Sequence, residues 1–187
     1  ELQQIAGRLA LVVDAEVARL HGDRIRVALA GRAFEWIEVP SGESQKSVAG
    51  VSRLWDWLAA HRVERAEHVV AIGAGFAAAT WRRGVPFVQV PTTLLAQVDA
   101  SVGGKVAIDH AGGKNLVGAF HQPVCVLADT TFLDTLPERE RWSGRAEVVK
   151  TALLAGDPLL SLVESSLAFL GIGDPTLPSW GRILAYG

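Results

Sequence analysis

The sequence has 187 residues, of which 49% are hydrophobic and 20% charged, and its formal net charge is −2. This length suits one large domain or two small ones, and it allows about 70% of the unfolded surface to be buried without disulfides or metals. The near-neutral charge gives no electrostatic support for a nucleic acid or an anionic membrane as the partner. Any anion would therefore be held by a local cluster of cations.

Cysteine content and hydropathy indicate the compartment. Cys125 is the only cysteine, so it cannot form an internal disulfide, and the apolar run VCVLAD around it predicts a small buried side chain rather than a catalytic thiol. A single cysteine fits a reducing compartment, and we expect a cytoplasmic protein. No apolar stretch reaches the ~18 residues of a membrane span, and no signal peptide is visible, although the sequence starts at Glu1 rather than at a methionine.

Short apolar runs alternate with segments of helical periodicity. Several runs end at an aspartate, a glycine or a proline, as strands do where they meet a turn. After the polar loop SGESQKS, helical spacing begins at Val48, with Ser44 or Ser47 as the N-cap. The pattern predicts strands at 8–14, 34–40, 68–73, 87–91 and 124–129, and helices at 15–31, from Val48 to Leu58, and at 137–156, where Pro137 lies in the first turn.

This alternation predicts an α/β fold in which crossover helices connect the strands of a parallel sheet. In such sheets, ligands bind beyond the carboxyl ends of the strands. Four segments directly follow expected strands, and we expect them to converge on one crevice: Asp14, the loop 41–46, Gly73 and the pair Thr92–Thr93. After residue 156 the sequence holds one weak helical segment and a tail rich in proline and glycine.

The segment PTTLLAQVDASVGGK, residues 91–105, combines hydroxyl, acidic, glycine and lysine residues directly after an apolar run. Thr92 and Thr93 stand where the amides of the next segment lack partners, and hydroxyls beside such amides can bind a phosphate or a ribose. Asp99 and Lys105 follow, separated by the flexible VGG. The alternative is structural, with the threonines as a helix cap and Lys105 as a solvated charge.

A second segment, HAGGKNLVGAFHQP at residues 110–123, has the residue types of a ligand-binding loop. Its paired glycines let the backbone approach a ligand closely. Lys114 supplies a point charge for phosphate, and Asn115 can both donate to and accept from a substrate hydroxyl. The alternative is a glycine-rich surface turn.

Two acid–base pairs are spaced at i, i+3. The Glu43 carboxylate, close to Lys46, could accept two ribose hydroxyls, whereas Glu147 and Lys150 could bind a metal and an anion, respectively. The alternative for both pairs is an ordinary ion pair worth a few tenths of a kcal/mol. No histidine pair has the i, i+4 spacing of a zinc-binding helix, and the sequence has neither a Gly-x-Ser-x-Gly elbow nor a Walker lysine loop.

Four blocks in this order resemble the 3-dehydroquinate synthases, which belong to the sugar-phosphate cyclases. The blocks are RGVPFVQVPTTLLAQVDASVGGK, GKNLVGAFHQP, FLDTLP and AEVVK. The resemblance is clear from about residue 40 to residue 155 and weaker before that. It implies an N-terminal nucleotide-binding α/β domain with a Rossmann-like parallel sheet and a C-terminal, mostly helical domain. We place residues 1–136 in the NAD-binding domain and residues 137–187 in part of the helical domain.

The resemblance also implies a lyase of the shikimate pathway, which leads to chorismate and the aromatic amino acids. Such an enzyme converts 3-deoxy-D-arabino-heptulosonate 7-phosphate into 3-dehydroquinate and inorganic phosphate. It binds NAD and a divalent metal, zinc or cobalt, and we expect a homodimer. In this family a transient oxidation by NAD precedes the loss of phosphate, and the ketone is reduced again before an internal aldol reaction closes the ring.

The family's site residues carry over to the matching positions of this sequence. They fall into residues that contact NAD, residues that bind the sugar phosphate, and one metal ligand. The NAD contacts implied are Asp14, Glu43, Lys46, Thr92, Thr93, Asp99, Lys114, Phe132 and Thr135, of which Asp99 and Lys114 could also face the substrate. The substrate residues implied are Lys105, Asn115, Lys150 and Arg83, and the metal ligand is Glu147. Arg83 matches an arginine that in some members reaches the phosphate across a dimer interface.

Two departures concern the cofactors. After VVAIG the family has a glycine-rich loop with an aspartate that cradles the pyrophosphate, whereas here Gly73 runs directly into AGFAAAT. The family also adds two histidines to the metal-binding glutamate, but no histidine follows His121, and a catalytic zinc takes about three protein ligands. One explanation covers both gaps, namely that residues are missing from this sequence after Gly73 and after about Leu160, which the intact mass would test.

A smaller departure lies in GGKVAIDH, where the family more often has threonine, glycine and asparagine at the positions of Val106, Ala107 and Asp109. An aspartate in place of an amide affects fine substrate contacts rather than the fold. Two other functions fit the same residues: a sister cyclase of the deoxy-inosose or valiolone type, and a non-catalytic nucleotide-binding relative that has lost its metal site. Iron-dependent alcohol dehydrogenases share the architecture but lack this lysine-rich substrate set.

Overall fold

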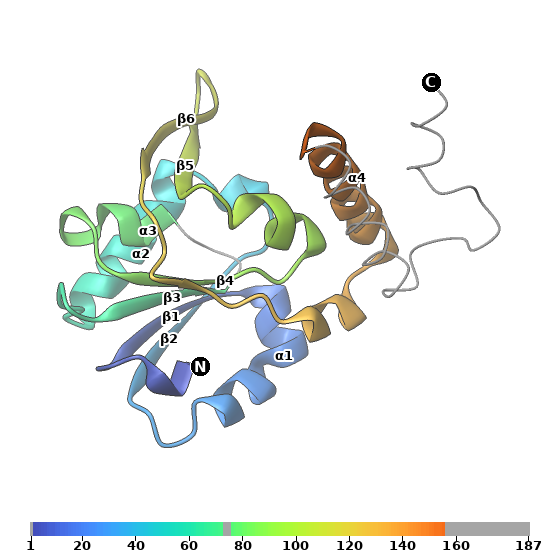
Figure 1. Ribbon diagram of the computed structural model, residues 1–187. Helices are drawn as coiled ribbons and strands as arrows, with labels where there is room; N and C mark the ends of the chain where they lie inside the picture. The colour runs from blue at the N-terminus through green and yellow to red at the C-terminus, as the bar shows by residue number, and fades with distance from the viewer. Residues whose placement is uncertain (1, 73–75, 156–187) are drawn as a thin grey trace, which may run out of the picture.

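The computed structural model describes residues 2–72 and 76–155 and confirms the α/β class (Figure 1). Five strands form one parallel sheet in the order β2-β1-β3-β4-β7. Because the order changes direction at β1, the carboxyl ends of β1 and β3 flank the point where sheets of this kind bind their ligands. The strands are β1 (Leu9–Asp14), β2 (Phe34–Val39), β3 (His68–Ile72), β4 (Phe87–Val90) and β7 (Cys125–Val126).

Helices cover both faces of this sheet. Figure 1 shows α1 on one face and α2 and α3 on the other, with α4 standing beyond the carboxyl ends of the strands. The helices are α1 (Ala15–Ala28), α2 (Val48–Ala60), α3 (Phe76–Thr80) and α4 (Glu138–Ala155). The short helical turns are η1 (Leu2–Gln4), η2 (Glu43–Gln45), η3 (Trp81–Arg83), η4 (Ala96–Ala100, a π-helix) and η5 (Thr130–Thr135).

The sequence of β1 explains why the sheet is buried on both faces. LALVVD has no polar residue before Asp14, and the five residues that precede it are all buried. Successive side chains of a strand point to opposite faces. Leu11 therefore belongs to the apolar cluster that includes Ile25 of α1, whereas Val12 belongs to the cluster that includes Leu58 of α2.

The predicted elements form with few changes at their ends. Ser47 rather than Ser44 is the N-cap of α2, because the Gly50 amide donates to the Ser47 hydroxyl at 3.2 Å. The last strand is shorter than predicted, since only Cys125 and Val126 pair with β4. Cys125 is half-buried against the cluster on the α1 side, so the prediction of a fully buried side chain was too strong.

The largest difference from the sequence prediction is a β-hairpin. The glycine-rich segment 110–123, expected to be a loop, contributes to two antiparallel strands, β5 (Lys105–His110) and β6 (Gly113–Phe120). Every residue of β6 is exposed, so no buried face imposes the alternation that reveals a strand in a sequence. Gly118 is needed for the pairing, because a Cβ there would lie 2.4 Å from the carbonyl oxygen of Val106. Figure 1 shows the hairpin rising away from the parallel sheet.

Several sequence predictions lie outside the described residues or are not tested by the structure. The gap after Gly73, and the weak helical segment and tail expected after residue 156, lie outside the described residues. The domain boundary after residue 136 falls between η5 and α4 and stays a prediction. Among the helices of residues 2–72 and 76–155, none is both long and apolar enough to cross a membrane.

Leu58 tests the placement of α2. Its side chain is 0% exposed, so Leu58→Ala should lower the free energy of unfolding by about 2–5 kcal/mol through lost burial and a residual cavity. Urea unfolding followed by circular dichroism measures this loss. Leu20→Ala, at a position of α1 that is 39% exposed, is the matched control and should cost less than about 1 kcal/mol. Equal losses in the two variants would contradict this core.

Candidate active site

Asp14 and the loop after β2 lie at the carboxyl edge of the sheet. Asp14 ends β1 and caps α1, because its Oδ1 accepts the amides of Glu16 at 2.9 Å and Val17 at 3.3 Å. The Ser41 hydroxyl donates to the same oxygen at 2.5 Å and so ties the loop to Asp14. Glu43 follows in that loop. Two carboxylates thus stand after adjacent parallel strands, where acidic side chains of nucleotide-binding sheets accept ribose hydroxyls.

Lys46 connects this loop to the hairpin. Its Nζ donates to Glu43 Oε1 at 3.4 Å and to Asn115 Oδ1 at 2.6 Å, while its carbonyl oxygen accepts the Asp109 amide at 2.8 Å. The ion pair that the structural alternative predicted is therefore present. Its side chains remain accessible, with 56% of Glu43 and 36% of Lys46 exposed. The structure thus brings two expected NAD contacts to the expected substrate residue Asn115.

The threonines after β4 have different surroundings. Thr92 is buried, and the Thr93 hydroxyl accepts the Ala96 amide at 3.1 Å, which makes Thr93 the cap that the structural alternative predicted. The segment continues into η4, where the Ser101 amide donates to the Ala96 carbonyl at 3.0 Å. Such π-helical turns are rare and often occur at functional sites. Asp99 is exposed on η4.

Glu147 and Lys150 form an ion pair on α4. The Glu147 side chain is 17% exposed and that of Lys150 is 57% exposed, so the carboxylate is largely buried and the ammonium group is exposed. The hydrogen bond to Glu147 raises the pKa of Lys150, and the negative charge of Asp99 adds to this effect. Asp99 belongs to η4, which α4 contacts.

Gly144 lets α4 approach the segment before η4. A Cβ at Gly144 would lie 2.6 Å from the Cβ of Leu94 and 2.8 Å from the amide nitrogen of Leu95. No flexible side chain could absorb this overlap. Because Gly144 stands one turn before Glu147, its missing side chain fixes how near Glu147 and Lys150 come to Asp99.

Phe132 and Thr135 of η5 are held against α1. Phe132 is 7% exposed, and the His21 ring meets it edge-on with the centroids 4.9 Å apart. The Arg24 guanidinium lies 5.5 Å from the Phe132 ring centroid and pairs with Asp129. His21 Nε2 is 2.7 Å from the Thr135 hydroxyl. Phe132 thus anchors η5, and Thr135 is the more exposed of the two expected NAD contacts.

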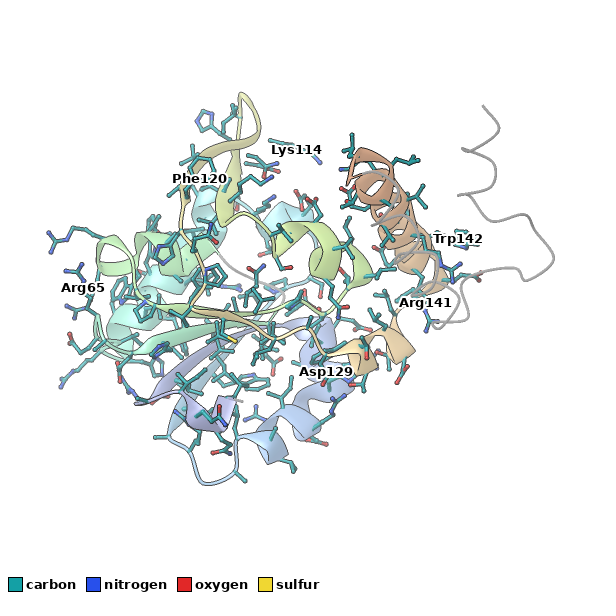
Figure 2. All side chains as sticks on the ribbon, viewed as in Figure 1. Arg65, Lys114, Phe120, Asp129, Arg141 and Trp142 are labelled. Carbon is teal, nitrogen blue, oxygen red and sulfur yellow. The ribbon has the colours of Figure 1, made fainter. Side chains whose placement is uncertain are left out.

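The remaining predicted cations lie on the hairpin and at the opposite edge of the sheet. Lys105 begins β5 and is exposed, as is Lys114 in β6. Figure 2 shows Lys114 on the hairpin toward α4. Arg83, in contrast, lies in η3 before β4 begins, and hence at the amino edge of the sheet. Gly84, which follows it, packs against His121, and the His121 amide donates to the Gly104 carbonyl oxygen at 2.8 Å, so η3 ends beside the base of the hairpin where Lys105 begins β5.

Lysine and arginine occupy different kinds of position in this chain. The sequence contains four lysines, and all four are predicted site residues in the loop after β2, in the hairpin or in α4. Structural ion pairs elsewhere use arginine, as in the pairs of Arg8 with Glu67 at 2.8 Å and of Arg82 with Glu64 at 3.0 Å. A lysine is a compact, strongly hydrated charge on a flexible stem, whereas arginine suits fixed structural pairs.

Glu147 is the predicted metal ligand. Within residues 2–72 and 76–155, no three side chains of histidine, cysteine, aspartate or glutamate gather in a way that could hold a metal ion. Glu147 is paired with Lys150 instead. Since a catalytic zinc takes about three protein ligands, the described residues do not fit a complete metal site.

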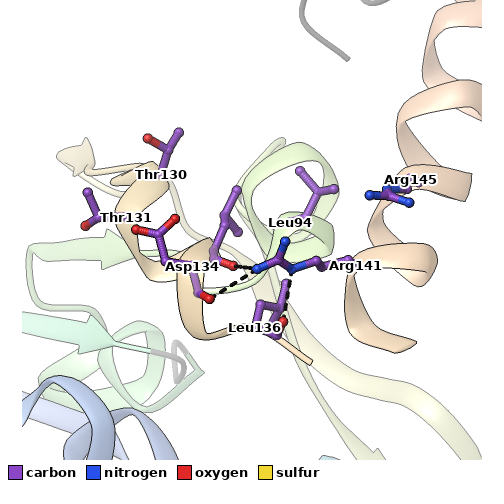
Figure 3. A pocket seen from close by; sticks show the side chains of 8 residues that line it. Leu94, Thr130, Thr131, Asp134, Leu136, Arg141 and Arg145 are labelled. Atoms are coloured by element: carbon purple, nitrogen blue, oxygen red, sulfur yellow. Dashed lines mark hydrogen bonds between the residues drawn. The ribbon is translucent and has the colours of Figure 1, made fainter. Parts of the chain in front are cut away.

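A cavity of about 180 Å³ lies between η5 and α4 (Figure 3). Arg141, on its wall, donates from Nη2 to the Leu133 carbonyl at 2.7 Å and from Nε to the Leu136 carbonyl at 3.0 Å, which closes the end of η5. Arg145, one turn later, stacks on Trp142 at 4.4 Å, and its Nε is buried without a hydrogen-bond partner among the described residues. Neither arginine was predicted as a site residue from the sequence, although the i, i+4 spacing of Arg141 and Arg145 on a predicted helix places both on one helix face.

Comparison with known proteins assigns the family. Residues 36–143 match the family model described as 3-dehydroquinate synthase N-terminal. The chain belongs to the 3-dehydroquinate synthase family. The 3-dehydroquinate synthase of Methylococcus capsulatus is 46% identical over 176 residues, which cover 90% of this chain and 49% of that relative. The chain spans about half the length of the curated relatives it matches.

Solved structures of cyclases share this fold. The 2-epi-5-epi-valiolone synthase from Streptomyces hygroscopicus subsp. jinggangensis 5008, with NAD⁺ and Zn²⁺ bound, has a TM-score of 0.75 at 32% identity over 81% of this chain and 45% of its own. A 2-deoxy-scyllo-inosose synthase in complex with carbaglucose-6-phosphate, NAD⁺ and Co²⁺ has a TM-score of 0.74 at 30% identity over 81% of this chain and 43% of its own. These likenesses confirm the fold expected from the family resemblance.

Two glycines in helices test the approach of α4. Gly144→Ala should lower the free energy of unfolding by about 1–3 kcal/mol, because the new methyl group overlaps Leu94 and the backbone of Leu95. Gly22→Ala in α1 is the matched control, since nothing lies within 4 Å of the added Cβ, and it should stabilise by about 0.5–1 kcal/mol. Chemical denaturation of both variants measures the difference. A stabilising Gly144→Ala would contradict the close packing of α4.

His21 predicts a pH dependence of stability. Its burial lowers its pKa, as does the charge of Arg24, against the opposing charges of Asp129 and Asp134. Just below the ordinary value of 6.5 the unfolded chain therefore binds more protons than the folded chain, so stability falls as the pH is lowered through this range. Urea unfolding at about pH 7.5 and about pH 5.5 should show a smaller loss in His21→Gln than in the wild type. The same loss in both proteins would contradict this assignment.

Proposed function

We propose that the chain forms the cofactor-binding part, and a share of the substrate site, of a 3-dehydroquinate synthase. This lyase converts 3-deoxy-D-arabino-heptulosonate 7-phosphate into 3-dehydroquinate and phosphate in the shikimate pathway. The observation that carries the proposal is the contact between Lys46 and Asn115, which joins the edge of the parallel sheet to the hairpin. A hydride acceptor on the sheet edge and a sugar phosphate on the hairpin would therefore meet at one place.

NAD is the cofactor that suits the sheet edge. Asp14 and Glu43 offer carboxylate oxygens after adjacent strands, and Thr135 offers a hydroxyl from η5, a donor set that suits ribose hydroxyls. When bound, NAD supplies the temporary acceptance and return of a hydride. The two cyclase structures described above hold NAD⁺, which supports the same cofactor here.

The lysines suit an anionic sugar phosphate. Three ammonium groups lie on the hairpin and on α4, namely those of Lys105, Lys114 and Lys150. The hydrogen bond to Glu147 raises the pKa of Lys150, which favours its charged form and hence a role in binding anions. Such charges hold the phosphate and carboxylate of the substrate, while Asn115 orients a hydroxyl. Their contribution is positioning and charge stabilisation.

A homodimer stays a prediction, and Arg83 is the residue that suggests it. Arg83 matches an arginine that in some members of the family reaches the substrate phosphate across a dimer interface, and it lies before β4 at the amino edge of the sheet. The metal also stays a prediction, because the described residues offer only Glu147, and the steps above use no metal.

One observation bears on the alternatives. Identity to a 3-dehydroquinate synthase is 46%, against 32% and 30% to the valiolone and deoxy-inosose synthases, which favours the dehydroquinate reaction over a sister cyclase. A non-catalytic, nucleotide-binding relative would bind NAD but show no turnover with any of these substrates. Phosphate release from the heptulosonate phosphate, compared with glucose 6-phosphate and sedoheptulose 7-phosphate in the presence of NAD and zinc, separates all three.

Lys105→Ala tests the substrate site. The variant removes an exposed positive charge that no core contact needs, so the fold should persist while kcat/KM falls by about 100- to 1,000-fold. Phosphate release and circular dichroism measure the two effects. Arg65→Ala removes an exposed cation near the opposite edge (Figure 2) and is the control that should keep full activity. An active Lys105→Ala protein would count strongly against the proposed function.

A further inference from the structure

Three residues from three elements form a closed ring of hydrogen bonds at the hairpin. The Asp109 amide donates to the Lys46 carbonyl oxygen at 2.8 Å. The Asn115 amide donates to Asp109 Oδ1 at 2.8 Å, and Lys46 Nζ donates to Asn115 Oδ1 at 2.6 Å. Each residue donates once and accepts once within the ring. Loss of any one bond therefore opens it.

Backbone irregularities explain why Asp109 closes this ring. The register between β5 and β6 shifts between Ile108 and His110, so the Asp109 amide turns to Lys46 instead of continuing the ladder. Asn115 has a φ of 56°, a left-handed conformation that costs roughly 1–2 kcal/mol for most residues and less for asparagine. The Asp109 carboxylate accepts the amide of this strained residue and so holds it in place.

The ring also fixes which groups Asn115 offers to a ligand. An ammonium group can only donate, so the side-chain oxygen of Asn115 must face Lys46, and its NH₂ group is left as the donor. Two of the three Lys46 protons go to Glu43 and Asn115. The third can reach a ligand without opening the ring.

We propose that Asp109 is a positioning residue that makes cofactor binding at Lys46 and substrate binding at Asn115 depend on each other. The inference rests on the proposed function, which takes Lys46 as a cofactor contact and Asn115 as a substrate contact. A cofactor that orders Lys46 orders Asn115 through the ring, so the second ligand loses less conformational freedom on binding. The coupling is reciprocal, because each ligand must raise the affinity for the other by the same factor.

The test measures this factor with an unreactive ligand, the product 3-dehydroquinate. Calorimetry on the full chain gives its affinity with and without NAD, and we expect NAD to tighten binding by about 5-fold or more in the wild type. Asp109→Ala should reduce the factor to nearly one. Asp109→Asn keeps an acceptor oxygen and should retain most of it. Asp56→Ala, at an exposed position of α2, should match the wild type.

A purely structural role for Asp109 predicts a different result. In that case Asp109→Ala would weaken the binding of both ligands and leave the coupling factor unchanged. This outcome overturns the inference. Hydrogen exchange of the wild type gives an answer even where Asp109→Ala does not fold: NAD alone should slow exchange at the amides of Asp109 and Asn115. Unchanged exchange overturns the inference and leaves the proposed function intact. A wild type that binds neither ligand overturns both.

Discussion

Burial of β1 on both faces is the constraint from which the site follows. Leu11 and Val12 face opposite layers of helices, so β1 can lie only in the interior of the sheet, between β2 and β3. Parallel pairing then puts the carboxyl ends of all the strands at one edge. Asp14, Glu43 and Thr92 lie along this edge because each follows a strand of the sheet.

Much of this arrangement could be predicted from sequence, because the apolar runs that end at Asp14 and Pro91 mark strands of the sheet interior and the alternating run that ends at Pro40 marks β2. The hairpin could not, since every residue of β6 is exposed and leaves no buried side to create a pattern. Contacts between segments far apart in the sequence could not be predicted either. Lys46 and Asn115 are 69 residues apart, and only the folded chain shows that they touch.

The sequence allowed two interpretations of each i, i+3 pair, a structural ion pair or a ligand-binding site, and the structure is compatible with both. Glu43 and Lys46 form the ion pair that the structural alternative predicted, yet both side chains stay exposed enough to contact a ligand. Glu147 and Lys150 also pair on α4, where only the Lys150 side chain is exposed and the missing side chain of Gly144 lets the helix approach η4. Such an ion pair does not argue against binding at the same residues, because its exposed groups can still contact a ligand.

The division between lysine and arginine has a practical consequence. Because all four lysines are predicted site residues, acylating or reductively methylating reagents would leave the structural cations untouched, as guanidinium groups do not react under the same conditions. Apart from the amino terminus, each covalent tag would therefore report on one predicted position of the site. Mass spectrometry of tagged peptides could then follow occupancy of the natural protein without any substitution.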